Sequence, residues 1–243
     1  MISADVFTQS DFSARFEWGY EGVEYVGNAS DIVVIVDVLS FTTCVDVVVG
    51  RGGVVFPYRF KDDTAQSFAM ENNAIVAGKR GEPISHSPAT LRAIPLHTRI
   101  VLPSPNGSTC TVLAKRGGGT VIAACLRNAS AVARYINRHG GSVTMIASGE
   151  RWPNGALRPA IEDMIAAGSI LDQLTSHHLS PEAKTAVASY RMAKNALLPT
   201  LAQSGSGQEL ISKGYVEDVH VAAAYDSSEC VPILGEQMGY TAC

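Results

Sequence analysis

An aspartate interrupts the most apolar stretch of the sequence. The run from Ile32 to Val48 reads IVVIVDVLSFTTCVDVV, in which Asp37 follows five aliphatic residues and precedes Ser40, Thr42 and Thr43. A carboxylate here could simply cap the next helix, but the hydroxyl residues beside it are already good N-caps. Asp37 is then available as a ligand for a hard cation such as Mg²⁺, which binds carboxylate and phosphate oxygens.

Three further carboxylates follow another apolar run. Glu150 lies in the segment SGERWPNG, and Glu162 and Asp163 lie just beyond Pro159, where a helix is expected to begin. Acidic residues in a first helical turn commonly do no more than complement the helix dipole. One or two carboxylates are enough for Mg²⁺ in proteins. The predicted metal ligands are therefore drawn from Asp37, Glu150, Glu162 and Asp163, and the predicted catalytic residues are Asp37, Glu162 and Asp163.

The segment SPNGST carries a second type of signal. Asn-Gly indicates a turn in any fold. Because it stands between an apolar strand and an apolar helix, its backbone amides and hydroxyls could also bind a phosphate. The residues predicted to contact phosphate oxygens are Asn106, Gly107, Ser108 and Thr109, together with Thr42 and Thr43.

Basic residues near expected loops could bind the remaining acid groups of a substrate. Arg80 lies in GKRGE, and Arg127 and Asn128 lie in CLRNAS. Single basic residues in loops are usually solvated surface charges. We nevertheless predict that Arg80, Arg127 and Asn128 contribute to substrate binding.

Two segments of the chain are weakly similar to one another. LSFTTCVDVVVGRGGVV and PNGSTCTVLAKRGGGTV share a polar turn, Thr-Cys, an apolar helix, Arg-Gly-Gly and a new strand, with one gap. A similarity of this length can also arise by chance. If it is real, two helix N-termini offer free amides and the positive end of a dipole, which favours an anion.

Short Val- and Ile-rich runs alternate with segments compatible with helices. Runs that are apolar on both faces are typical of parallel strands covered by helices on both sides. The pattern predicts a single domain over residues 1–243, a three-layer α/β/α sandwich with a largely parallel central sheet. The expected strands are Ile32–Val36, Gly53–Pro57, Ala74–Ala77, Arg99–Leu102, Thr120–Ala124, Ser142–Ala147 and His220–Tyr225. The expected helices are Thr42–Gly50, Asp62–Asn72, Ser108–Lys115, Ala129–Arg138, Pro159–Leu174, Pro181–Leu198 and Gly207–Lys213.

Composition narrows the class of protein. The 243 residues are 46% hydrophobic and 17% charged, with a formal net charge of −4. This balance provides no basic field for nucleic acid. No apolar run is long enough for a membrane span, and the N-terminal residues lack the pattern of a signal peptide, so a cytoplasmic protein is expected. The five cysteines are widely spaced, which favours buried thiols over disulfides or a zinc site.

Taken in order, several segments resemble the 2-phosphosulfolactate phosphatase family. They are VVIVDVLSFTT, GKRGEPISHSPATL, LPSPNGSTC, CLRNASAVA, ASGERWPNG with IEDMIAAGSIL, and GQELISKGYVEDVHVAAAYDSSECVPIL. The resemblance implies a three-layer α/β/α fold, Mg²⁺ and a magnesium-dependent acid phosphatase of coenzyme M biosynthesis. Family members commonly have an arginine where this chain has Ser40, so the resemblance supports the reaction type more strongly than the substrate.

The resulting hypothesis is a magnesium-dependent phosphatase that hydrolyses a phosphate monoester of a small anionic acid, 2-phosphosulfolactate or a relative. Its expected partner is a small-molecule phosphate ester, with no nucleic acid and no membrane, and a homodimer is compatible with the sequence. The alternative is a non-catalytic protein that binds small anions or phosphometabolites through the same residues. Turnover of a phosphate ester separates the two.

Overall fold

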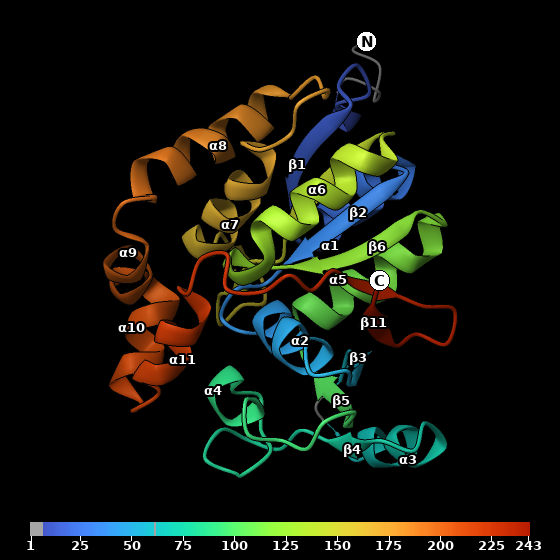
Figure 1. Cartoon of the computed structure of the whole chain (residues 1–243), viewed down its shortest axis with the longest axis vertical. Helices are drawn as coiled ribbons and strands as arrows, with labels where there is room; N and C mark the ends of the chain where they lie inside the picture. Colours follow the sequence, from blue (N-terminus) through green and yellow to red (C-terminus); the bar gives the residue numbers. More distant parts are fainter. Residues whose placement is uncertain (1–6, 61) are drawn as a thin grey trace.

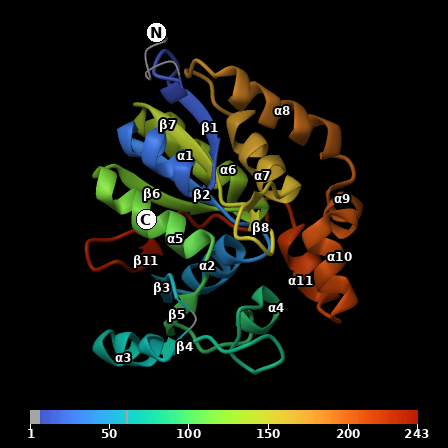
Figure 2. The same ribbon diagram turned by 180° about the vertical axis from the view of Figure 1, so that it is seen from behind.

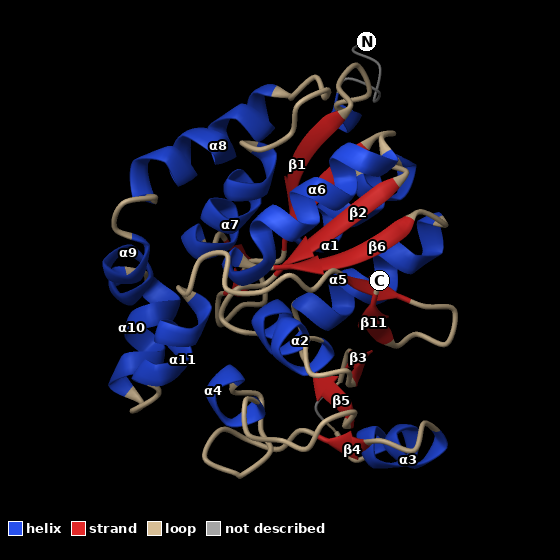
Figure 3. Cartoon of the chain, in the orientation of Figure 1, coloured by secondary structure: helices blue, strands red, loops and turns tan. Residues whose placement is uncertain are grey.

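The apolar runs of the sequence form one large sheet (Figures 1 and 3). The computed structural model describes residues 7–60 and 62–243, and within them nine strands follow the order β1-β7-β2-β6-β10-β11-β3-β5-β4. The strands are β1 (Ala14–Trp18), β2 (Ile32–Val36), β3 (Val54–Tyr58), β4 (Ile75–Val76), β5 (Arg99–Pro103), β6 (Thr120–Ala124), β7 (Val143–Ala147), β10 (Pro232–Leu234) and β11 (Tyr240–Ala242). A separate short hairpin pairs β8 (Glu150–Arg151) with β9 (Leu157–Arg158).

Most neighbouring strands run parallel. The exception is the hairpin of β10 and β11, which pairs antiparallel with β6 on one side and β3 on the other. This hairpin therefore joins two parallel groups, β1-β7-β2-β6 and β3-β5-β4, into one sheet. Parallel strands align their carboxyl ends, so the loops after β2, β6 and β7 emerge at one edge.

Helices cover both faces of the sheet. They are α1 (Gly19–Tyr25), α2 (Phe41–Val49), α3 (Thr64–Glu71), α4 (Pro88–Leu91), α5 (Gly107–Ala114), α6 (Ala129–His139), α7 (Ile161–Leu171), α8 (Pro181–Ala193), α9 (Leu197–Gln203), α10 (Gly205–Ser212) and α11 (Val216–Ala222), with 3-10 turns at Gly27–Ala29, Lys115–Gly117 and Leu126–Asn128. Helix α6 lies in front of the strands in Figure 1, with α7 and α8 beside β1, whereas α1 and α5 lie in front of the strands in the view from behind (Figure 2).

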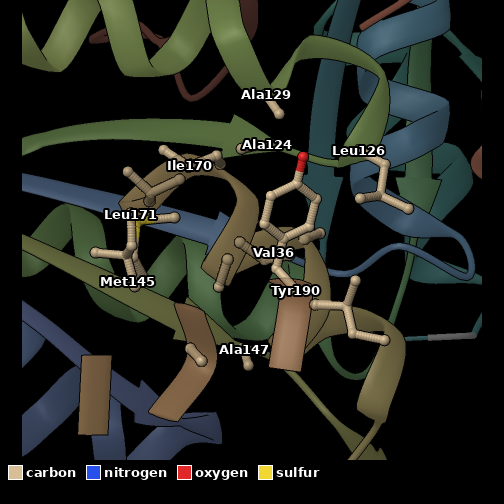
Figure 4. Packing of buried hydrophobic residues seen from close by; sticks show 14 of the residues in the cluster. Val36, Ala124, Leu126, Ala129, Met145, Ala147, Ile170, Leu171 and Tyr190 are labelled. Atoms are coloured by element: carbon tan, nitrogen blue, oxygen red, sulfur yellow. The ribbon is translucent and has the colours of Figure 1, made fainter. Parts of the chain in front are cut away.

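The two layers correspond to two hydrophobic clusters. Val34 and Val36 of β2 point into a cluster with α6, α7 and α8, and Val33 and Ile35 point into the cluster with α1, α2 and α5. Figure 4 shows the first cluster, where the ring of Tyr190 lies among the side chains of both strands and helices. A strand that is apolar on both faces is what a covered parallel sheet requires, and the predicted three-layer α/β sandwich is confirmed.

Six of the seven expected strands are present, but the seventh is wrong. Residues 220–225 do not form the expected strand, because α11 ends at Ala222 and a turn follows. A short apolar run cannot be told from a buried helix by its pattern alone. Here Val219 and Ala222, three residues apart, pack into the first cluster together, which is the spacing of a helix.

Other elements differ from expectation in smaller ways. The helix expected over Pro181–Leu198 is two helices, α8 and α9, and Ser180 caps α8 by accepting from the Ala183 amide (3.1 Å), as its sequence indicates. The sequence predicts neither the β10–β11 hairpin nor β1, whose apolar and charged residues alternate over only five positions. Across the part of the chain that is described, no helix combines the length and apolarity needed to cross a membrane.

Helices α7 and α8 pack closely because Gly168 lies between them. A methyl group built on Gly168 would lie 2.0 Å from the Ala186 carbonyl oxygen and 3.1 Å from the Tyr190 Cβ. The first of these atoms is backbone, so the helices must move apart to admit it. The glycine therefore costs helix propensity and allows the close approach of α8.

We expect Gly168→Ala to lower the stability of the protein, although alanine is the better helix former. Overpacking of this kind costs roughly 1–3 kcal/mol, which corresponds to a fall in Tm of about 2–4 °C per kcal/mol for a chain of this size. Thermal unfolding followed by circular dichroism measures the effect. The control is Gly235→Ala, whose added methyl group would meet only the Gly239 carbonyl oxygen at 3.5 Å. An unchanged Tm in Gly168→Ala would contradict the close packing.

Candidate active site

Asp37 lies where β2 ends and is held by two helices. Its Oδ1 accepts a hydrogen bond from the Phe41 amide (3.0 Å), and its Oδ2 accepts one from the Gly107 amide (2.9 Å). These are the first residues of α2 and α5, the helices of the two similar sequence segments. Both helix N-termini therefore bind the protein's own carboxylate. Asp37 caps α2, contrary to the expectation that a neighbouring hydroxyl does so, because the N-cap residue Ser40 makes no side-chain cap hydrogen bond.

Asp163 plays the same role on the other side of β2. Its Oδ1 accepts from the Val38 amide (2.8 Å) and its Oδ2 from the Gly149 amide (3.0 Å). The side chain thus joins the turn after β2 to the turn after β7. It is 3% exposed, although it belongs to the first turn of α7, where acidic residues usually face solvent.

Glu150 and Glu162 complete a group of four carboxylates. Glu150 Oε2 accepts from Asn106 Nδ2 (2.9 Å), which brings the loop after β7 to the loop after β5. Glu162 is 2% exposed, and its charge acts on Asp37, Glu150 and Asp163. The structure therefore brings all four predicted metal ligands to one edge of the sheet, as the sequence indicates.

Burial raises the pKa values of three of these carboxyl groups. Asp37 reaches a pKa of about 6, chiefly through desolvation, and the Phe41 and Gly107 amides offset part of the rise. Burial and then the charge of Asp37 raise the pKa of Glu150 to about 7. Burial, followed by the charges of Asp37 and Glu162, raises the pKa of Asp163 well above its usual range. Burial therefore favours the neutral form of these groups, and repulsion between the carboxylates adds to the effect.

The hydroxyls predicted to bind phosphate have local partners instead. Thr42 Oγ1 donates to the Asp37 carbonyl (2.8 Å) and accepts from the Asp37 amide (2.9 Å), and Thr43 Oγ1 donates to the Val38 carbonyl (2.7 Å). Ser108 Oγ donates to the Leu102 carbonyl (2.9 Å). All three side chains are fully buried, and their hydrogen bonds stabilise the turns that end β2 and β5. They hold the backbone in place and do not line an open site.

The other predicted phosphate contacts lie near the carboxylates. Gly107 donates its amide to Asp37, and a methyl group at this position would clash with Phe41 Cδ1 at 2.3 Å. Asn106 contacts Glu150 through its amide nitrogen, and its Oδ1 is buried without a hydrogen-bond partner among the described residues. Thr109 lies in the first turn of α5 and is 5% exposed.

Arg80 lies beside this group of carboxylates, but Arg127 and Asn128 do not. Arg80 donates to Ser40 Oγ, and its charge lowers the pKa of Asp37. Arg127 instead pairs with Asp46 (Nε–Oδ2, 2.8 Å) and lines a separate cavity of about 740 Å³ beside the C-terminal end of α2. Asn128 accepts from the Cys125 amide (2.9 Å) and is fully buried, so it shapes the turn after β6.

A cleft opens next to the carboxylates. Its volume is about 770 Å³, and Leu39, Arg80, His86 and Glu150 line it together with residues of α3, α10 and the Lys213–Tyr215 turn. Glu150 is the member of the carboxylate group that lines the cleft, and the charge of Asp37 raises its pKa. A small-molecule ligand has room here.

Two residues near the site escape prediction from the sequence. Asp218 of α11 accepts from Arg80 Nε (3.0 Å), and it lies two residues before the segment for which a strand is expected. Arg151 follows Glu150, and its guanidinium carbon lies 3.9 Å from the centre of the Tyr20 ring. Its Nε and Nη2 are buried and, within the described part of the chain, have no hydrogen-bond acceptor. The sequence offers one signal for Arg151 as a site residue, which is its position next to Glu150.

The side chains as they stand do not form a ready metal cage. Among residues 7–60 and 62–243, no three His, Cys, Asp or Glu side chains are arranged so that they could hold a metal ion by themselves. The arrangement can still attract a cation, because four acidic groups act on one another here. The positive charge of Arg80 opposes this attraction only in part. The fold and the site define an α/β protein with an acidic ligand site at the carboxyl edge of a parallel sheet.

Comparison with known proteins places the chain more narrowly. The family model described as 2-phosphosulpholactate phosphatase matches residues 21–237. Similar proteins include one from Carboxydothermus hydrogenoformans, 28% identical over 86% of this chain and 89% of its own, and one from Thermotoga maritima, 25% identical over 83% and 88%. Both carry the name "probable 2-phosphosulfolactate phosphatase". This chain belongs to the 2-phosphosulpholactate phosphatase family, and the resemblance found in the sequence is confirmed.

The raised pKa of Glu150 predicts how stability depends on pH when no divalent cation is present. A carboxyl group whose pKa is higher in the folded protein than in the unfolded chain binds its proton more tightly when folded. Its stabilising contribution is complete below the ordinary glutamate pKa of 4.5 and is lost as the pH rises through about 7. Glutamine mimics the neutral acid and keeps an oxygen for Asn106.

We therefore expect Glu150→Gln, in EDTA, to raise Tm relative to the wild type at pH 8 by a few degrees and to leave it nearly unchanged at about pH 4.5. Thermal unfolding at both pH values measures the difference. The control is Glu236→Gln, since the Glu236 side chain is 94% exposed. A Tm difference that is the same at both pH values would contradict the raised pKa.

Proposed function

We propose that the protein is a Mg²⁺-dependent phosphatase that hydrolyses a phosphate monoester of a small anionic acid, 2-phosphosulfolactate or a relative. The observation that carries the proposal is the group of four buried or half-buried carboxylates beside a cleft in a chain of this family. The names of the similar proteins support the substrate.

The donor set suits magnesium, which binds hard oxygen ligands and usually takes only one or two carboxylates, with water and phosphate oxygens as the rest. Because no three of the described carboxylates can hold the ion together as they stand, Asp37 with Glu162 or Asp163 would hold it, while Glu150 lines the cleft. Burial is the main cause of the raised pKa values, and repulsion between the carboxylates, which a divalent cation would offset, adds to it. The buried Asn106 Oδ1, without a partner among the described residues, also marks a place for a further polar group. When bound, the metal would polarise the phosphate and lower the pKa of a water molecule.

The residues of the chain itself would bind and orient the ester. The amide nitrogen of Asn106 and the backbone of the Asn106–Thr109 turn lie next to Asp37, so the phosphate is expected there. Glu150 lines the cleft, and with its pKa of about 7 it is suited to take a proton from the attacking water near neutral pH. Arg80, on the cleft wall, would bind the acid group of the substrate.

Phosphate release from 2-phosphosulfolactate and a panel of other phosphate monoesters tests the proposal. We expect release that requires Mg²⁺, is abolished by EDTA and is restored when Mg²⁺ is added back. Asp37→Asn should lower kcat by about 100-fold or more, because metal catalysis supplies several kcal/mol.

The control for folding is the Tm of Asp37→Asn, measured in EDTA. Binding of the esters without any release by the wild-type protein would favour the alternative, a protein that binds small anions without turnover. Release that is unaffected by EDTA would contradict the role of the metal.

A further inference from the structure

Asp218 is a buried carboxylate with three partners from two other segments. Its Oδ2 accepts from Arg80 Nε at 3.0 Å, and its Oδ1 accepts from the Ser87 hydroxyl and from the Ala89 amide (3.2 Å). The side chain is 1% exposed. Asp218 belongs to α11, so its side chain connects this helix both to the loop that carries Arg80 and to the start of α4.

These contacts give the Arg80 guanidinium one orientation. Asp218 holds its Nε, Ser40 accepts from its Nη2, and the Tyr215 ring lies 5.8 Å from its central carbon. The two hydrogen bonds occupy two of the five N–H donors of an arginine. The side chain is 25% exposed and lines the cleft, so donors remain for an oxyanion that enters it.

The position of Arg80 in the cleft indicates which end of a substrate it would contact. Asn106 and Gly107 contact Glu150 and Asp37, and neither of them is among the residues that line the cleft. Arg80 lines the cleft wall together with Lys79 and Tyr215. A substrate whose phosphate lies at the carboxylates would therefore present its other end to Arg80.

We infer that Asp218 is a positioning residue that holds Arg80 in place to bind the second acid group of the substrate, a carboxylate or sulfonate, and that this pair determines specificity. The inference rests on the proposed function. A planar guanidinium fixed at Nε binds such a group with directed hydrogen bonds, which a freely rotating side chain forms at greater entropic cost. Loss of Asp218 should thus weaken binding of esters that carry the second acid group and spare those that lack it.

The chain contains a matched control. Asp46 is also buried, with a side chain that is 0% exposed, and it pairs with Arg127 through Nε at 2.8 Å and with the Ser228 hydroxyl at 2.6 Å. This pair lies at the other cavity, away from the carboxylates. Asp46→Asn therefore breaks the same kind of buried ion pair without touching the cleft.

The experiment compares Asp218→Asn, Arg80→Gln and Asp46→Asn on two esters, phosphoglycolate, which carries a carboxylate, and ethyl phosphate, which does not. We expect Asp218→Asn and Arg80→Gln each to raise the ratio of KM for phosphoglycolate to KM for ethyl phosphate roughly tenfold, the worth of one charge-assisted hydrogen bond. The ratio is the readout because Arg80 also acts on Asp37, so its loss can affect both esters. The double variant should be little worse than Arg80→Gln alone, because both changes remove one interaction.

Asp46→Asn should lower Tm about as much as Asp218→Asn while leaving both KM values unchanged. Equal increases in KM for the two esters, or the same increase in Asp46→Asn, would show a general loss of structure and overturn the inference. If Asp218→Asn does not fold, Arg80→Gln and Arg80→Lys carry the test, with lysine expected to restore only part of the affinity for phosphoglycolate.

Calorimetric binding of glycolate keeps this test separate from turnover. A wild-type protein that binds glycolate, with weaker binding in Asp218→Asn, would support the positioning role even if no phosphate ester were hydrolysed. Active wild-type protein with unchanged KM in Asp218→Asn would leave the proposed function standing and refute the inference.

Discussion

The site depends on one interaction, the binding of the Asp37 carboxylate by the first amides of two helices. Each oxygen takes one amide, from Phe41 of α2 and from Gly107 of α5, at 3.0 and 2.9 Å. A buried carboxylate without such partners would cost several kcal/mol. Helix N-termini offer both free N–H groups and a positive dipole end, so they can hold an anion without a paired cation. The same contact fixes β2, α2 and α5 relative to one another.

The chain treats its buried carboxylates in two different ways. Asp46 and Asp218 are each paired with an arginine, which neutralises their charge within the fold. Asp37 and Asp163 instead receive backbone amides, and Glu150 receives a side-chain amide. Burial raises the pKa values of these groups, and it also raises the pKa of Asp46 in spite of its arginine. The two kinds of carboxylate therefore differ in their partners, because amides orient a carboxylate but contribute no full positive charge, and a group of carboxylates without a paired cation is a candidate ligand site.

The sequence predicts where the carboxylates gather because strand ends are visible in it. The run before Asp37 is apolar on both faces, and a polar residue directly after such a run must lie at the ligand edge of a parallel sheet. The same argument cannot show which partner a polar group takes. Thr42 and Thr43 look like ligand contacts, yet their hydroxyls bind nearby carbonyls, because a turn that closes a buried strand needs those bonds itself. Arg127 also follows a strand, but it pairs with Asp46 at the other cavity. Position at a strand end therefore predicts the edge on which a side chain lies, and the direction in which it points depends on contacts between segments.

Ser40 shows how such a contact alters the meaning of a local pattern. By resemblance to the family, an arginine is common at this position, and its loss alone would suggest a weaker anion site. In the structure, Ser40 Oγ accepts from Arg80, so a guanidinium from another loop already lies beside the turn that carries Asp37. A second arginine at position 40 would place two like charges side by side, whereas serine provides an acceptor for the first. Arg80 therefore supplies positive charge beside Asp37, and α11 holds this arginine in place through Asp218.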